Sequence, residues 1–216
     1  MRIKSLFIKG VVTRWIRMYI KDVNGLNNFS RDHPYLIVCN HNSIFDSLAI
    51  SAVFIKHTSR IVGVVAKIKS SKNTFCDRIL VGISKRLANF FVDIISVLKH
   101  KVVEITSHRL RKGKNIMIFP EGRNNRGKEL LPCKSGAARI AIMSKIPVLP
   151  VGIINSEKII PQNKYLPRFR RMTVNIGEPL TFEDYYDKDV GKKEIDEVTR
   201  KIMEKVAELC HKKYPY

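Results

Sequence analysis

A histidine and an aspartate five residues apart are the side chains of this sequence whose types and spacing best suit chemistry. His41 and Asp46 lie in segment 40–46, directly after the short apolar run 36–39. A carboxylate at this spacing can fix the imidazole tautomer and stabilise the cation that forms when the ring accepts a proton. Because no covalent nucleophile with its own base stands out, the pair predicts a general base that activates a substrate hydroxyl. A turn or a helix cap is the simpler interpretation, so the prediction needs a second motif.

That second motif follows another apolar run and reads Phe-Pro-Glu-Gly-Arg at residues 119–123. Glu121 and Gly122 come directly after an expected strand, as His41 does, so the two motifs can face one cleft. A glycine at this point permits a tight approach of the backbone. A loop ion pair with a neighbouring arginine is the structural alternative for Glu121.

The two motifs resemble those of the lysophosphatidic acid (1-acylglycerol-3-phosphate) acyltransferases of the PlsC type. That family shows N-H-x-S-x-x-D, then F-P-E-G-T-R-S-R with L-L-P-F-K-x-G-A, and then a strand P-V-x-P-V, here residues 147–151. A weaker middle element resembles residues 65–67 and 91–93. All occur in family order, and the resemblance covers roughly residues 34–180.

The resemblance implies an O-acyltransferase that moves a fatty acyl group from acyl-coenzyme A or acyl carrier protein to 1-acylglycerol 3-phosphate, giving phosphatidic acid. It implies a His41–Asp46 general-base dyad, no acyl-enzyme and no cofactor besides the acyl donor. The resemblance also implies that Glu121, Gly122 and Arg126 bind substrate, and Arg123 and Lys134 are further candidates for this role. For Arg123, Arg126 and Lys134 the alternative is a solvated basic loop in an already basic protein.

One departure from the family leaves the acceptor open. The family's Thr-Arg after Glu-Gly is Arg123-Asn124 here, and asparagine cannot bind a phosphate bidentately as a guanidinium does. Arg123 can supply the lost charge from the preceding position. Another lysolipid, such as a lyso-ornithine lipid or a lysophospholipid, therefore remains an alternative acceptor.

Composition narrows the class of partner. The 216 residues are 44% hydrophobic, and 40 Lys+Arg against 19 Asp+Glu give a net charge of +21. This balance predicts an anionic partner, which is an acidic membrane surface or a phosphorylated substrate. Nucleic acid is disfavoured, since neither zinc-finger spacing nor an RNA-recognition signature occurs and only one tryptophan is present. A non-catalytic basic membrane- or nucleic-acid-binding protein is the alternative from another class, and a hydrolase is a lesser one.

The cysteines and histidines predict neither disulfides nor a metal. The four cysteines are scattered without C-x-x-C spacing, which favours reduced thiols and hence the cytoplasmic side of a membrane. Cys39 and Cys133 adjoin the motifs and are expected to be buried as small apolar side chains. No second histidine or carboxylate has ligand spacing to His41, so no metal site is predicted.

Residues 1–28 are expected to form an amphipathic helical segment ahead of an acyltransferase domain over residues 29–216. At helical spacing its apolar side chains share one face, and the opposite face carries only cations. Two interpretations stay open: the helix lies in the membrane interface, or it packs on its own domain. The purely cationic polar face favours the membrane interface. The chain is thus expected to be a peripheral or monotopic membrane protein.

The rest of the chain alternates between strand and helix patterns, which predicts an α/β domain with a central mixed, mostly parallel sheet flanked by helices. In such sheets, sites form at the carboxyl ends of strands, where both motifs fall. The expected strands are 35–39, 61–66, 91–97, 115–119, 148–153 and 172–176, and the expected helices are 47–55, 77–90, 104–112, 134–145 and 192–211.

Overall fold

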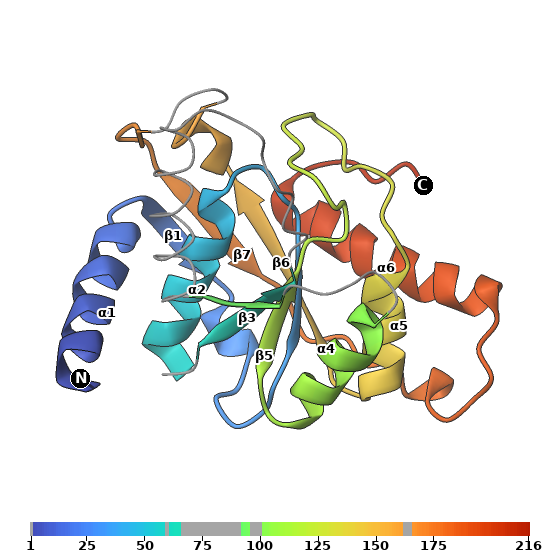
Figure 1. Cartoon of the computed structure of the whole chain (residues 1–216). Coiled ribbons are helices and arrows are strands. Elements are labelled where there is room, and N and C mark those ends of the chain that lie inside the picture. Colours follow the sequence, from blue (N-terminus) through green and yellow to red (C-terminus); the bar gives the residue numbers. More distant parts are fainter. Residues whose placement is uncertain (1, 59–60, 66–91, 96–100, 162–165) are drawn as a thin grey trace, which may run out of the picture.

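A seven-stranded sheet lies at the centre of the computed structural model, with helices on both of its faces (Figure 1). The structure describes residues 2–58, 61–65, 92–95, 101–161 and 166–216. Half of the weak middle motif (residues 66, 67 and 91) and the helix predicted over 77–90 lie outside them. The strands are β1 (Ile20–Asn24), β2 (Leu36–Cys39), β3 (Val62–Val65), β4 (Val92–Ile95), β5 (Asn115–Ile118), β6 (Val148–Ile154) and β7 (Met172–Ile176). The helices are α1 (Arg2–Arg17), α2 (Phe45–Thr58), α4 (Val102–Arg111), α5 (Gly136–Ser144) and α6 (Lys192–Cys210).

The sheet is mixed but mostly parallel, which confirms the predicted fold class. Its strand order is β1-β7-β6-β2-β5-β3-β4. Every neighbouring pair from β6 to β4 is parallel, β7 runs antiparallel to β6, and β1 runs parallel to β7. Strand β2 therefore has a parallel neighbour on each side, β5 and β6, and both motif-bearing strands end at the same edge.

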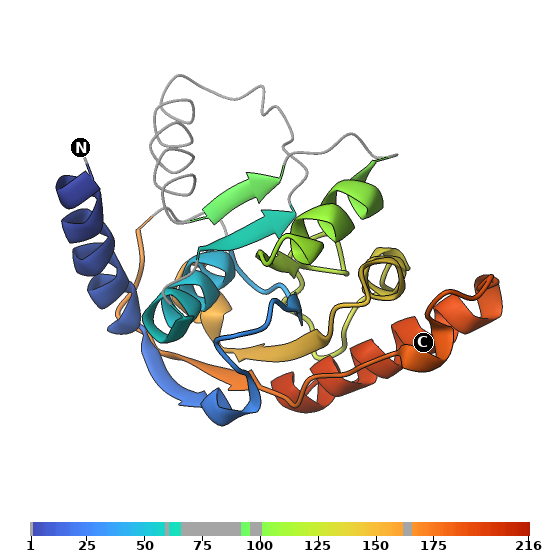
Figure 2. The ribbon, with the colours of Figure 1, turned by 90° about the horizontal axis from the view of Figure 1, so that it is seen from below.

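Strand β2 is buried on both faces. Leu36 and Val38 belong to the core beneath α4, α5 and α6, whereas Ile37 and Cys39 belong to the core beneath α1 and α2. Figure 2 shows these two helical layers on opposite sides of the sheet. A run of four apolar residues without alternation is typical of a strand covered on both sides, and here it places the His41 loop at the middle of the sheet.

The N-terminal helix is shorter than predicted. Helix α1 ends at Arg17, and Ile20–Asn24 form the edge strand β1 instead of continuing as helix. The reason is tertiary: β1 pairs with β7, a pairing that local periodicity does not reveal. The division into two units at residue 28 stays a prediction.

Helix α6 packs closely on β6. Its apolar side chains recur every three or four residues and are buried against the sheet. Gly152 of β6 makes the close approach possible, because a Cβ atom at this position would overlap the backbone of Leu209. This contact places the last turn of α6, and so the residues after it, beside β6.

Candidate active site

The two motifs meet at the carboxyl ends of neighbouring strands. His41 follows β2 and Phe119 follows β5, and these strands are adjacent and parallel. After β2 the chain passes to α2 on one face of the sheet, and after β5 it passes to α5 on the other face. Loops that diverge in this way open a crevice at the carboxyl edge of an α/β sheet, where ligands bind.

His41 and Asp46 are in hydrogen-bond contact. Nδ1 of His41 lies 3.0 Å from Oδ2 of Asp46. The Asp46 side chain is 0% exposed, and that of His41 is 19% exposed. Because Nδ1 faces the carboxylate, Nε2 is the ring nitrogen left to accept a proton from a substrate. This geometry, with a buried carboxylate behind the ring, suits a general base.

The backbone holds Asp46 in place. Its Oδ2 also accepts the N–H groups of Asn42 and Ser43, each at 2.7 Å. Asp46 lies in the first turn of α2, where a carboxylate is stabilised by free N–H groups and by the helix dipole. Three donors on one oxygen fix the carboxylate before any substrate binds.

Phe119 covers one side of the imidazole. The two rings stack with their centroids 4.0 Å apart and an interplanar angle of 23°. Since Phe119 follows β5, this contact fixes the His41 ring against the second motif and leaves less of the ring open to water.

Glu121 joins the two motif loops. Its carboxylate is buried and accepts the backbone N–H of His41 on Oε1 at 3.2 Å. Its Oε2 accepts the Asn125 side-chain amide at 2.7 Å and the Leu131 N–H at 2.9 Å. The predicted contact of Glu121 with the acceptor stays a prediction, and the structure gives this residue a scaffolding role that sequence did not suggest.

A Glu121→Ala variant is expected to lose about 2–4 kcal/mol of unfolding free energy, because three donors in the protein lose their acceptor. Urea unfolding measures this as a lower midpoint at unchanged slope. Glu129→Ala, which removes an exposed carboxylate from the same loop, is the control. Equal midpoints for the two variants would contradict the scaffolding role.

The remaining predicted positions lie on the segment after β5. Gly122 has a φ of 68°, a conformation that glycine adopts without strain. Arg123, Arg126 and Lys134 are all exposed. Of these three, Arg126 lines a cavity of about 520 Å³, and its Nη2 donates to the Ile160 carbonyl at 3.2 Å.

Three further polar residues hold the site together and were missed from sequence. The buried Asn40 accepts the Ile153 N–H at 2.7 Å and donates to the Ile153 carbonyl at 2.9 Å, which ties the end of β2 to β6. Asn125 donates its backbone N–H to the His41 carbonyl at 2.6 Å. Lys212 donates to Asn42 Oδ1 at 2.9 Å and to the Asn125 carbonyl at 3.2 Å.

The sequence carried a signal for two of these three residues. Asn40 and Asn125 lie within the motifs, and a buried asparagine can pair with the backbone as a peptide group does. Lys212 follows an amphipathic helix far from both motifs, and nothing in its local pattern distinguishes it from the other surface lysines.

The cysteines beside the motifs are buried or half-buried thiols, as expected. Burial raises the pKa of Cys39 well above its usual value, and the nearby charges of Asp46 and Glu121 raise it further. Burial also raises the pKa of Cys133, although its hydrogen bond with Tyr214 opposes this change. Neither residue therefore provides a thiolate nucleophile at neutral pH.

The fold and the paired motifs define an acyltransferase domain, and a family comparison agrees. The model of the acyltransferase family matches residues 21–154, more than half of the chain, so the chain belongs to this family.

Named relatives point to one branch of that family. The chain is 28% identical over 174 residues to the 1-acyl-sn-glycerol-3-phosphate acyltransferase alpha of Ovis aries, a match that covers 78% of this chain and 57% of the relative. It is 32% identical over 112 residues to the 1-acyl-sn-glycerol-3-phosphate acyltransferase of Escherichia coli (strain K12), covering 50% and 43%. The chain thus matches about half of the length of these relatives.

A solved structure supports the fold. The 1-acyl-sn-glycerophosphate (LPA) acyltransferase PlsC from Thermotoga maritima aligns with a TM-score of 0.64 at 18% identity, covering 97% of this chain and 83% of that one. At this identity, the likeness is evidence for the architecture alone.

Proposed function

We propose that this chain transfers a fatty acyl group from acyl-coenzyme A or acyl carrier protein to the free hydroxyl of 1-acylglycerol 3-phosphate, giving phosphatidic acid. The observation that carries the proposal is the contact between His41 Nδ1 and the fully buried Asp46, at the carboxyl end of the central strand. The names of the relatives support the choice of acceptor.

The chemistry follows from the position of the dyad. An alcohol attacks a thioester slowly unless a base removes its proton in the transition state, and Nε2 of His41 is the atom free to do so. Asp46 stabilises the imidazolium that forms. The alkoxide oxygen forms an ester bond with the acyl carbon, the carbon–sulfur bond breaks, and the thiolate of the donor leaves with the proton that His41 returns. No acyl-enzyme is needed.

Purified protein incubated with labelled acyl-coenzyme A and detergent-dispersed lysophosphatidic acid tests the proposal. Labelled phosphatidic acid is the expected product. A panel of other lysolipids belongs in the same experiment, because the exposed Asn124 stands where the family motif has arginine. Transfer only to another lysolipid would replace the acceptor and keep the mechanism. No transfer from acyl-coenzyme A, and none in a repeat with acyl carrier protein as donor, would overturn the proposal.

We further propose that α1 docks the protein on a membrane surface. The helix and the turn after it have two sides. Ile16 and Tyr19 are buried against the domain, whereas Val11, Trp15 and Met18 are 53%, 44% and 54% exposed. Among the described residues, no helix has the length and apolar character needed to cross a bilayer. An exposed apolar face on a helix that does not span the bilayer suits the interface between lipid headgroups and chains.

A second segment extends this face. The Phe169 ring, 70% exposed, lies 6.1 Å from that of Tyr19. Exposed arginines accompany it at Arg168, Arg170 and Arg171, and α1 adds Arg14. Cations beside an apolar patch attract anionic lipids at about 1 kcal/mol per side chain near the surface.

A Trp15→Glu variant is expected to bind vesicles of mixed neutral and anionic phospholipid about tenfold more weakly, because a carboxylate replaces an interfacial aromatic side chain. Co-sedimentation with the vesicles gives the partition coefficient. Ile105→Glu, a change at an exposed apolar residue of α4, is the control. If both variants bind like the unchanged protein, the docking face lies elsewhere.

A further inference from the structure

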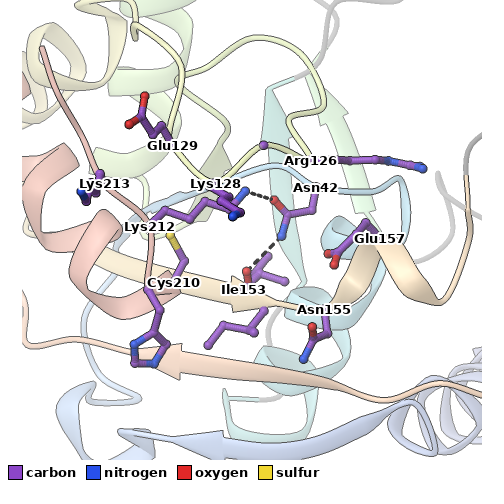
Figure 3. Close-up of a pocket in the computed structure, with 13 residues that line it drawn as sticks. Asn42, Arg126, Lys128, Glu129, Ile153, Asn155, Glu157, Cys210, Lys212 and Lys213 are labelled. Carbon is purple, nitrogen blue, oxygen red and sulfur yellow. Dashed lines mark hydrogen bonds between the residues drawn. The ribbon is translucent and has the colours of Figure 1, made fainter.

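A cavity at the His41 loop is built largely by residues outside the two motifs. It measures about 520 Å³ and lies next to Asn42, the neighbour of His41 in sequence. Its walls come from the loop after β5, the end of β6 and the segment after α6 (Figure 3). Its charged lining consists of Arg126, Lys128, Lys212 and Lys213, with Glu129 and Glu157.

Lys212 is the cation best placed to bind a ligand there. Its side chain is half-buried and points toward Asn42 (Figure 3). Both of its hydrogen-bond acceptors, Asn42 Oδ1 and the Asn125 carbonyl, are neutral. An ammonium group has three protons, so one donor remains after these two bonds. Among the described residues, none of the ion pairs involves Lys212.

The backbone holds this lysine in position. At the end of α6, His211 adopts a left-handed conformation with a φ of 55°, which turns the chain back over the sheet edge. The Lys213 carbonyl then accepts the Leu130 N–H at 2.8 Å. Tyr214 lies 3.1 Å from Cys133 through its hydroxyl. The segment after α6 is thus fastened along the loop that follows β5.

We propose that Lys212 binds a phosphate group of a substrate in this cavity, with Arg126 and Lys128 as further cations on its wall. A partly desolvated ammonium with neutral hydrogen-bond partners favours an anion, because among the described residues no carboxylate forms an ion pair with it, although Glu129 and Glu157 lie on the same cavity wall. The identity of this substrate rests on the proposed acyl transfer, whereas the phosphate site itself does not. The phosphate belongs either to the acceptor headgroup or to the nucleotide part of the donor.

Calorimetric titration with two probes tests the site without any turnover. Glycerol 3-phosphate represents the acceptor headgroup, and adenosine 3′,5′-bisphosphate represents the donor. Lys212→Met keeps much of the side-chain length and removes the charge. For the probe that binds in this cavity, the dissociation constant is therefore expected to rise about 10–100-fold. Lys192→Met, at an exposed lysine at the start of α6, is the control.

The outcomes separate the two sources and the two proposals. Weaker binding of glycerol 3-phosphate in Lys212→Met alone assigns the site to the acceptor, and weaker binding of the bisphosphate assigns it to the donor. Probe binding without acyl transfer would sink the proposed function and keep the site. No binding of either probe at millimolar concentration, or equal binding by both variants, would overturn the phosphate site.

Steady-state kinetics distinguishes binding from mere support of the loops. A phosphate ligand predicts a raised KM for one substrate in Lys212→Met and a KM restored in part by Lys212→Arg, which keeps the charge. An equal fall of kcat in both variants with KM unchanged would mean that Lys212 only links the two loops.

Discussion

In the His41→Ala variant, acyl transfer is expected to fall by about 10²–10⁴-fold, because the alcohol then loses its proton to water and not to a positioned base. The fold should persist, because the bonds that join the two loops at this residue use its backbone: its N–H to Glu121 and its carbonyl to Asn125. Asp46 also keeps two backbone donors in the variant.

Initial rates with saturating acyl donor measure the loss. His108→Ala, a change at an exposed histidine of α4, should retain the rate of the unchanged protein. Urea midpoints and vesicle binding identify any loss that is due to misfolding. Transfer by His41→Ala at the rate of the His108→Ala control would remove His41 from the mechanism.

The Asp46→Asn variant is expected to lower kcat by about 10²–10⁴-fold with little change in KM. The amide oxygen can still accept the N–H groups of Asn42 and Ser43, so the loop keeps its shape. What is lost is a buried negative charge that stabilises the His41 cation only as the proton moves, and such an interaction contributes to kcat.

Asp196→Asn, at an exposed position of α6, is the matched control for loss of one negative charge. The decisive comparison is kcat at saturating concentrations of both substrates, with stability measured in parallel. A kcat for Asp46→Asn within about twofold of this control would show that the carboxylate is only a helix cap.

The helices and strands that were predicted most accurately are those whose hydrophobic periodicity is visible in the local sequence. Residues 172–176 were predicted as a strand and form β7 with the same bounds, because buried and half-buried positions alternate along it. The predicted helix over 192–211 differs from α6 by one residue for the same kind of reason. The dyad itself was predictable because both of its members belong to one short segment.

What sequence could not give is pairing between distant segments. Strand β1 is only five residues long, carries two exposed charged residues and owes its existence to β7. Glu121 looked like a ligand for substrate, yet its bonds to His41, Asn125 and Leu131 depend on two loops meeting across the sheet. Lys212 reaches the site only because α6 packs closely on Gly152.

The position of β2 between β5 and β6 also bears on how the chain folds. Asn40 bonds to a residue 113 positions later, and His41 bonds to one 80 positions later. During synthesis, the apolar strand β2 therefore stays unpaired until β5 and β6 have been made. Contacts of such long range slow folding and leave an unpaired strand edge open to other chains. Newly made chains should thus aggregate through β2 more readily than through the late, locally formed α6.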